Sequence, residues 1–357
     1  MRRLLRIVVR LVAALLLIVV LLLVPVGYIE LFCQGEENQQ DYQPQITDLE
    51  FQRAEANSFL TYPEWHIVYA YQGLAEVLKT GDEYRFGYLS SIGGFWSSAC
   101  ALNRKAGEHG AGDFNTRATI HVIGVSFTFE MLMKALYEET LGRLFAILRG
   151  GEKSPQDHYA AMMAEDYGNF LEQTPWYKYD FRKSSAELWA QPLAMPVRGW
   201  ERRLALGGEW KAKAAYAGVI ANAVAAAGQA QLRIRTVVTG MLPSELAAMN
   251  DVDVIDTTPQ HVIIETPRYR VYTRILQAIA RAGGNVAEIA GNNDIMITAI
   301  ASANAPELPE GATLITSVGR DGFPGNRLLI ETRVAVLADL LRAFEQGPVR
   351  LEHVYDY

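Results

Sequence analysis

Residues 11–29 of this chain read LVAALLLIVVLLLVPVGYI, and this stretch decides how the rest of the chain is placed. All nineteen residues are uncharged. At a rise of about 1.5 Å per residue, such a helix nearly crosses the hydrocarbon core of a bilayer, and residues 7–9 extend it. A helix is the only open-chain structure that satisfies its own backbone hydrogen bonds in lipid. We therefore predict a transmembrane anchor over residues 1–33 that contacts the bilayer through residues 7–29.

The charges that flank this run predict its orientation. Four arginines, at positions 2, 3, 6 and 10, are the only charges before Glu30. Six acidic residues, beginning with Glu30, then precede the first basic residue, Arg53. Positive charge is retained on the cytoplasmic side of a membrane. We therefore predict a single-pass protein of the inner (plasma) membrane, with its N-terminus in the cytoplasm and its body in the periplasm of a bacterial-type envelope.

A cleaved signal peptide is the alternative interpretation of the same stretch. Its apolar region spans only about 7–15 residues and ends in small residues at a cleavage site. Here the apolar run is longer, and residues 28–32 read YIELF, which offers no such site. The bulky Phe32 also disfavours lipoprotein processing at Cys33. The sequence favours an uncleaved anchor.

Charge and composition exclude some classes of function. The formal net charge is −7, and because the four N-terminal arginines contribute +4, the remainder carries −11. An acidic body argues against nucleic-acid binding and against attachment to anionic lipid over a broad face. Half of the residues are hydrophobic, enough to bury substantial cores.

The two cysteines, Cys33 and Cys100, form neither a disulfide framework nor a metal-binding motif by their spacing. Cys33 ends the anchor and Cys100 lies in a predicted buried helix. We expect them to be unpaired, as small apolar side chains.

The middle of the chain, residues 51–248, predicts a mainly helical domain after a polar linker over residues 34–50. Pro63 and Gly81 bracket a helix over residues 64–79, and Ser154 and Pro155 begin another. Further helices are predicted over residues 86–105 and 119–148. Residues 214–232 are uncharged and rich in alanine, so a second membrane span and a tightly packed soluble helix both stay open.

The helix predicted over residues 119–148 carries a charged stripe. Glu130, Lys134 and Glu138 follow one another at intervals of four, which places them on one face. We interpret this face as solvated ion pairs. A carboxylate-bridged metal site is not favoured, because it needs Glu-x-x-His on two helices, and no such pair is present. We predict no metal site.

The last part, residues 249–357, predicts strands alternating with two helices. Strands are expected over residues 261–266, 286–289, 295–300, 313–318, 327–332 and 349–355, and helices over 269–282 and 334–344. Residues 291–294 read GNND, which indicates a hairpin between the second and third strands. This order predicts a C-terminal ferredoxin-like α/β sandwich, so the fold class is α+β.

One cluster of polar and aromatic residues stands out near the start of the first helix. Its members are Tyr62, Glu64, Trp65, His66, Tyr69 and Tyr71, of which the first five are candidate ligand-binding residues. Tyr62, Trp65, His66 and Tyr69 share a helix face by spacing. They form either the wall of a ligand pocket or an aromatic core stripe with one satisfied histidine. His121, in the long helix, is a sixth candidate, and with His66 it invites a haem clamp. Nothing else in the sequence calls for haem, and the cofactor stays unknown.

These features support a non-catalytic accessory or binding protein, held in the membrane and accepting a hydrophobic ligand or a membrane-protein partner. The alternative is an envelope enzyme that acts on a lipid or a glycan, with His66, Glu64 and His121 as acid–base residues. No nucleophile elbow, P-loop or dinucleotide-binding motif is present in the sequence.

Overall fold

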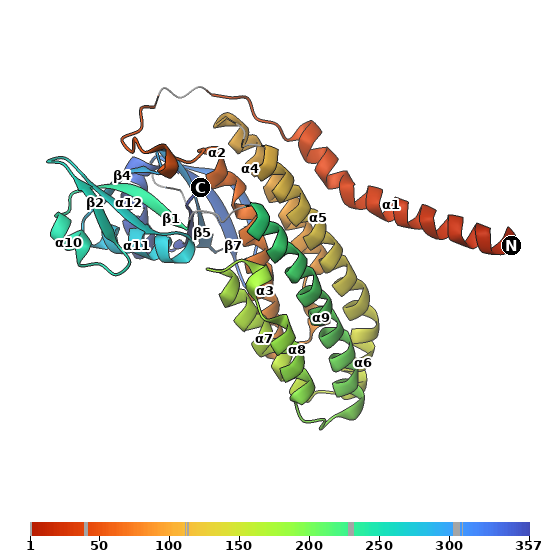
Figure 1. Cartoon of the computed structure of the whole chain (residues 1–357). Helices are drawn as coiled ribbons and strands as arrows, with labels where there is room; N and C mark the ends of the chain where they lie inside the picture. The colour runs from red at the N-terminus through yellow and green to blue at the C-terminus, as the bar shows by residue number, and fades with distance from the viewer. Residues whose placement is uncertain are drawn as a thin grey trace.

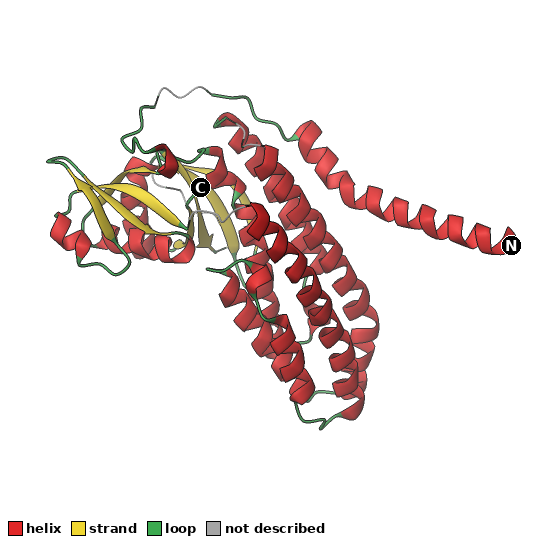
Figure 2. Cartoon of the chain, in the orientation of Figure 1, coloured by secondary structure: helices red, strands yellow, loops and turns green. Residues whose placement is uncertain are grey.

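Three parts make up the computed structural model, as Figure 1 shows: a projecting helix α1, a helical bundle, and a C-terminal part that contains the strands. Figure 2 shows how the strands gather beyond one end of the bundle. The residues that the structure describes are 2–38, 42–110, 112, 114–227, 232–302, 308 and 310–357.

Helix α1, Arg2–Phe32, is the predicted apolar segment. It continues as one helix through Pro25, and no residue of its most apolar 18-residue stretch is buried against the rest of the protein. By length and composition, α1 fits a membrane anchor or a signal sequence. Among the described residues, a second stretch, Asn115–Arg149, also passes this test, with a third of its window buried. Residues 214–232, the sequence's own second candidate, lie partly outside the described residues.

Cys33 and Cys100 form a disulfide, so the prediction that they are unpaired was wrong. The bond joins the residue after α1 to the middle of α4, Tyr88–Glu108. The backbones of α4 and the chain after α1 approach closely there, because Asn103 donates to the carbonyl of Cys33 at 2.8 Å and a Cβ on Gly35 would clash with Arg104. Sequence spacing could not show this approach.

The bundle consists mainly of helices that the sequence predicted. Helix α3, Tyr62–Thr80, has Pro63 in its first turn and ends at Gly81. Helix α7, Pro155–Leu171, begins with a capping box at Ser154. The other helices are α2 (Ala56–Leu60), α4, α5 (Phe114–Tyr137), α6 (Arg143–Arg149), α8 (Phe181–Ala190) and α9 (Pro196–Ala227), with short helical turns η1 (Leu49–Phe51), η2 (Glu83–Arg85) and η4 (Trp176–Lys178).

The long helix predicted over residues 119–148 is confirmed, with one local change. Helices α5 and α6 are joined by a π-helical turn, η3, at Glu138–Gly142. A π-turn inserts one extra residue into the helix and occurs often at functional sites. Here it rotates the residues after Glu138 around the helix axis, relative to their positions in an uninterrupted α-helix.

The C-terminal strands form two four-stranded antiparallel sheets rather than one. The first has the order β2-β3-β1-β4, and the second has β6-β7-β5-β8. Their strands are β1 (Arg233–Thr239), β2 (Asp253–Thr257), β3 (Val262–Pro267), β4 (Asn285–Ile289), β5 (Asp294–Ala301), β6 (Ala312–Gly319), β7 (Asn326–Arg333) and β8 (Arg350–Tyr355). The helices are α10 (Pro243–Ala247), α11 (Tyr269–Arg281) and α12 (Val334–Gln346).

The hairpin predicted at residues 291–294 was wrong. Strands β4 and β5 belong to different sheets, and only a bridge between Ile289 and Asn292 joins their ends. A tight Gly-Asn turn here redirects the chain from one sheet to the next. The sequence also missed β1 and β2, since β1 directly follows the alanine-rich helix and β2 is mostly exposed.

Strand β5 links the C-terminal core to the bundle. Ile295, Ile297 and Ala299 share a core with α11, α12 and strands of both sheets. Met296, on the opposite face of β5, packs with residues of α2, α3 and α4. Because successive strand residues point to opposite faces, one strand serves two cores.

The segment before α2 crosses the first sheet as a strap. The carboxylate of Glu288, on β4, accepts hydrogen bonds from the Tyr42 hydroxyl at 2.6 Å and from the backbone of Ile46 at 2.8 Å. Arg235 lies 3.5 Å from the centre of the Phe51 ring. This part of the polar segment predicted as a linker is therefore packed onto the body.

Candidate functional site

Four of the six candidate residues lie together where the bundle meets the second sheet. The Trp65 ring stacks on His353 of β8, with centroids 3.6 Å apart. The Tyr69 hydroxyl lies 3.1 Å from the hydroxyl of Tyr355, and Tyr62 packs against the same ring. All of these side chains are buried. They form a continuous aromatic seam between two parts of the molecule.

His66 lies at the bundle side of this seam. Its Nε2 is 2.9 Å from the carbonyl of Ser91, and the rings of Phe95 and Phe127 meet it edge-on. Burial lowers the pKa of His66 to about 3, so the ring is neutral at physiological pH. Because a carbonyl oxygen can only accept a hydrogen bond, the neutral ring carries its proton on Nε2 and donates it to Ser91.

The other two candidates lie apart from His66. Glu64 is exposed on α3. His121 is 2.7 Å from a carboxylate oxygen of Glu30, which also pairs with Arg117 at 3.0 Å. His121 therefore fastens α5 to the last turns of α1. The structure brings four of the six candidates together, and the haem clamp between His66 and His121 finds no support in these contacts.

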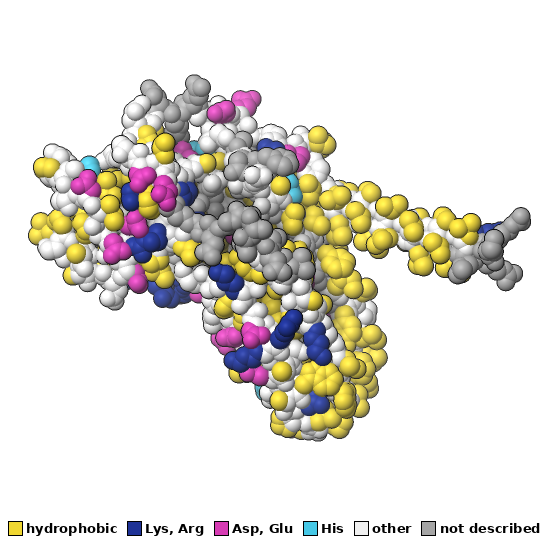
Figure 3. All heavy atoms as spheres, in the orientation of Figure 1, with side chains coloured by type: hydrophobic (Ala, Val, Ile, Leu, Met, Phe, Trp, Pro, Cys, Tyr) yellow, Lys and Arg dark blue, Asp and Glu magenta, His cyan; other side chains and the backbone are white. Residues whose placement is uncertain are grey.

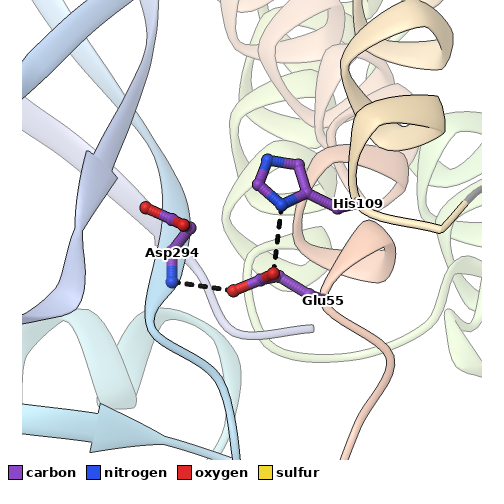
Figure 4. Close-up of side chains that lie close together, drawn as sticks. All are labelled: Glu55, His109 and Asp294. Carbon is purple, nitrogen blue, oxygen red and sulfur yellow. Dashed lines mark hydrogen bonds and ion pairs between the residues drawn. The ribbon is translucent and has the colours of Figure 1, made fainter. Parts of the chain in front are cut away.

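A second cluster joins α2, α4 and β5, as Figure 4 shows. The His109 ring lies between two carboxylates, with Nδ1 3.0 Å from Glu55 and Nε2 2.7 Å from Glu331. Glu55 also accepts the backbone N–H of Asp294 at 2.8 Å. Burial alone would lower the pKa of His109, but the hydrogen bonds to Glu331 and Glu55 raise it to about 9.

Glu55, His109 and Asp294 also meet the spacing of a metal site, since one ligand atom from each lies within 4.8 Å of the others. A metal needs a ring nitrogen with a free lone pair. Both ring nitrogens of His109 instead face carboxylates, which suits a protonated ring that donates twice. This cluster is an ion-pair clamp between the bundle and the second sheet, beside an open polar pocket of about 620 Å³.

The far end of the bundle contains a buried network of charges. The Arg202 guanidinium is fully buried and contacts Glu83, Glu138 and Glu201. Arg198, one turn earlier, pairs with Glu201 and with Asp157 of α7, each at 2.8 Å. At this end of the bundle, helices α5–α6, α7 and α9 thus meet through ion pairs, in addition to the apolar core that they share elsewhere.

A second network continues this polar interior toward the middle of the bundle. Lys213 of α9 pairs with Glu130 at 2.8 Å, and Lys134 pairs with Glu209 at 2.7 Å. Glu130, Lys134 and Glu138 thus share one helix face, as predicted. The prediction that this face is solvated was wrong, because it points into the bundle and Glu138 is only 5% exposed.

The opposite face of α5–α6 is apolar and exposed. From Phe129 to Leu148 its members lie one, three or five residues apart, on one side of the helix. Figure 3 shows this yellow surface along the edge of the bundle on the side of α1. We call it the apolar stripe: Val122, Phe129, Leu132, Met133, Leu136, Leu141, Leu144, Ile147 and Leu148.

This arrangement departs from the usual polarity of a bundle helix in water: charged side chains of α5–α6 lie inside, next to the apolar core, while the apolar stripe is exposed. The sequence identified the charged face of this helix but predicted that it is solvated, and the apolar stripe was not predicted. The missed signal lies on α9, where Arg202, Glu209 and Lys213 supply the partners for Glu138, Lys134 and Glu130. Two helices with complementary charged faces bury those faces against each other.

Comparison with protein-family models, with curated protein sequences and with solved structures finds no match to this chain.

Proposed function

We propose that this chain is a membrane-anchored accessory protein of a bacterial-type envelope, whose helical bundle lies against the bilayer through the apolar stripe. The observation that carries the proposal is the pair of faces on α5–α6: its charged stripe points into the bundle, next to the apolar core, and its apolar stripe is exposed. Charged residues in a membrane face the interior of a bundle and pair with one another, while apolar residues face lipid. Arg202 and Leu136 occupy these two environments, at 0% and 65% exposure.

The attachment of α1 to the bundle supports this placement. The disulfide of Cys33 and the pairs of Glu30 with Arg117 and His121 hold the end of α1 beside the start of α5. With α1 in the bilayer, α5 begins at the membrane surface. The apolar stripe begins further along α5, at Val122, and continues from Phe129 to Leu148.

The free energy available from this contact is substantial. Full burial of a Leu, Ile or Phe side chain contributes about 1.5–3 kcal/mol. Each side chain of the stripe is exposed by roughly half, so each gains on the order of 1 kcal/mol in an apolar medium. An amphipathic surface of this kind binds membranes in proportion to its apolar area.

The disulfide also supports the proposed compartment. Disulfides persist in oxidising environments such as the bacterial periplasm and are rare in the cytosol. Together with the arginines before the apolar run, this favours a cytoplasmic N-terminus and a periplasmic body.

The C-terminal part suits a role in protein contacts. Each sheet has the strand order of a ferredoxin-like unit, with the first and third of its four strands at the centre. We propose that the chain carries two such units in tandem, and that the bundle holds them at the membrane surface.

Depth measurements on labelled full-length protein test the proposal. The two native cysteines are paired, so a single added cysteine takes a fluorescent label specifically. In vesicles, a label at Leu136→Cys on the apolar stripe is expected to fluoresce as in an apolar medium and to be quenched by nitroxide lipids. The matched control is Glu165→Cys, on the exposed face of α7, whose label is expected to be quenched by aqueous iodide.

Equal quenching of both labels by iodide would contradict contact with the bilayer. A label at position 136 that is shielded from iodide yet untouched by lipid quenchers would place a second protein on the apolar stripe, and would also overturn the proposal.

The enzyme alternative gains nothing from the geometry. His66 is neutral and buried in the aromatic seam, Glu64 is exposed, and His121 fastens α1. An acid–base pair needs its members within reach of one substrate. If His66→Gln abolished the biological activity while leaving the thermal unfolding of the protein unchanged, the enzyme alternative would be restored.

A further inference from the structure

A groove of about 490 Å³ runs between α8 and α9 on the surface of the bundle. Its floor is made of small side chains, and one aromatic ring forms a wall. Two cations line it, and no carboxylate is among the described residues that line it. The residues that matter here are Ala186, Ala214, Ala215, Trp189, Arg182 and Lys211.

The two cations of the groove are free to take an anion. Within the described part of the chain, neither Arg182 nor Lys211 forms an ion pair, whereas their neighbour Lys183 lies 3.8 Å from Glu187. Both side chains are exposed. The ammonium of Lys211 lies 5.5 Å from the centre of the Trp189 ring, which holds it at the wall of the groove.

The surface next to the groove has the composition of a membrane interface. Arg203 lies between the rings of Trp189 and Trp200, at 5.6 Å and 5.5 Å from their centres. Val197, Trp200 and Leu204 are exposed on the outer ridge of α9. Tryptophan rings with neighbouring cations are typical of the headgroup level of a bilayer. In Figure 3 dark-blue and yellow side chains lie side by side over the lower bundle, where Figure 1 places α8 and α9.

We propose that the groove binds one anionic phospholipid, with its phosphate between Arg182 and Lys211 and its glycerol and first acyl carbons on the alanine floor beside Trp189. Charge complementarity and the apolar floor together favour a lipid. The body is acidic as a whole, so this attraction is local to the groove. The inference rests on the proposed contact between the bundle and the bilayer.

Native mass spectrometry of the full chain in detergent tests the proposal, with phosphatidylglycerol and phosphatidylcholine as the added lipids. The wild type is expected to retain phosphatidylglycerol in preference to phosphatidylcholine. Each cation near a headgroup changes lipid affinity by about fivefold. The double variant Arg182→Ala/Lys211→Ala is therefore expected to bind phosphatidylglycerol about thirtyfold more weakly.

The matched control is Lys183→Ala/Lys178→Ala, which removes the same charge from the neighbouring surface and is expected to bind as the wild type does. Equal retention of the two lipids by the wild type would overturn the proposal. So would equal loss in the control and the groove variants, because a general charge effect would then explain the binding. The depth of the label at position 136 is measured independently, so failure of the groove and failure of the bilayer contact are distinguishable.

Discussion

The Arg202 guanidinium lies out of contact with solvent among Glu83, Glu138 and Glu201. Desolvation of so many charges is costly, and their mutual attraction offsets that cost only while every partner is present. Burial raises the pKa of Glu83 to about 8 in spite of the Arg202 charge. At neutral pH this carboxyl is therefore largely protonated, which reduces the excess of negative charge around Arg202.

Loss of Arg202 is expected to be severe. Arg202→Leu leaves buried carboxylates without their cation, and breaking a buried pair in this way costs about 3–5 kcal/mol. The free energy of unfolding, measured with denaturant in detergent, is expected to fall by this amount. The control is Arg281→Leu, which removes a surface ion pair between Arg281 of α11 and Glu345 of α12 and is expected to change the free energy of unfolding by less than about 1 kcal/mol. Similar values for both variants would show that the buried network contributes little.

The clamp at His109 makes stability depend on pH. The pKa of His109 is about 9 in the folded protein, against an ordinary value of 6.5. Because the folded value is the higher one, the protonated ring stabilises the fold fully below pH 6.5, and this contribution is lost as the pH rises through about 9.

His109→Gln is expected to remove this dependence. The variant should be less stable than the wild type by at most about 2 kcal/mol at pH 6, and the difference should vanish above pH 9. Thermal unfolding of both proteins across this pH range measures it. A difference that stays constant with pH would mean that the ring acts by packing on Phe59 rather than by its charge.

At the scale of elements, α5–η3–α6 combines two incompatible faces. One carries Glu130, Lys134 and Glu138, and the other carries the apolar stripe. The π-turn at Glu138–Gly142 lies where Glu138 meets Arg202. The packing of α9 decides which face is buried, because α9 supplies the cations and carboxylates that pair with the charged one.

The disulfide is the second feature at this scale, since it links α1 to α4. It closes a loop of 67 residues, and in the chain-entropy model this stabilises the fold by about 4 kcal/mol. The double variant Cys33→Ser/Cys100→Ser is expected to unfold at lower denaturant concentration by up to this amount. A reducing agent should destabilise the wild type and leave the double variant unchanged. If the reducing agent had no effect on the wild type, the bond would not form in the protein.

At the scale of the whole molecule, four connections described above hold the parts together: the aromatic seam of α3 with β8, the His109 clamp, the packing of β5 on the bundle, and the strap over the first sheet. Each joins residues far apart in sequence. The bundle and the sheets therefore form one body, to which α1 is fixed by the disulfide.

Local pattern was enough to predict most elements. Apolar periodicity, Pro63, Gly81 and the capping box at Ser154 located the helices, because these signals act within a few residues. The α+β class followed from the change of period in the C-terminal third. The pairing of the strands could not be predicted from local pattern, because the division into two sheets depends on which strands lie side by side in the folded protein.

The candidate site was predictable in part for the same reason. The shared face of Tyr62, Trp65, His66 and Tyr69 follows from helical spacing. What that face meets depends on β8, almost three hundred residues later in the chain. The direction of the charged stripe on α5 depends likewise on Arg202, Glu209 and Lys213, whose role appears only when α9 is packed beside it.

The position of Cys33 carries a consequence for biosynthesis. On the proposed topology, Cys33 emerges from the membrane as the first thiol outside the cytoplasm, and Cys100 follows only after a further 67 residues have been exported. An oxidising catalyst must then join two thiols at the mouth of the translocation channel before the bundle closes over them. We expect a cell that lacks periplasmic thiol oxidation to accumulate this chain in a form that proteases degrade.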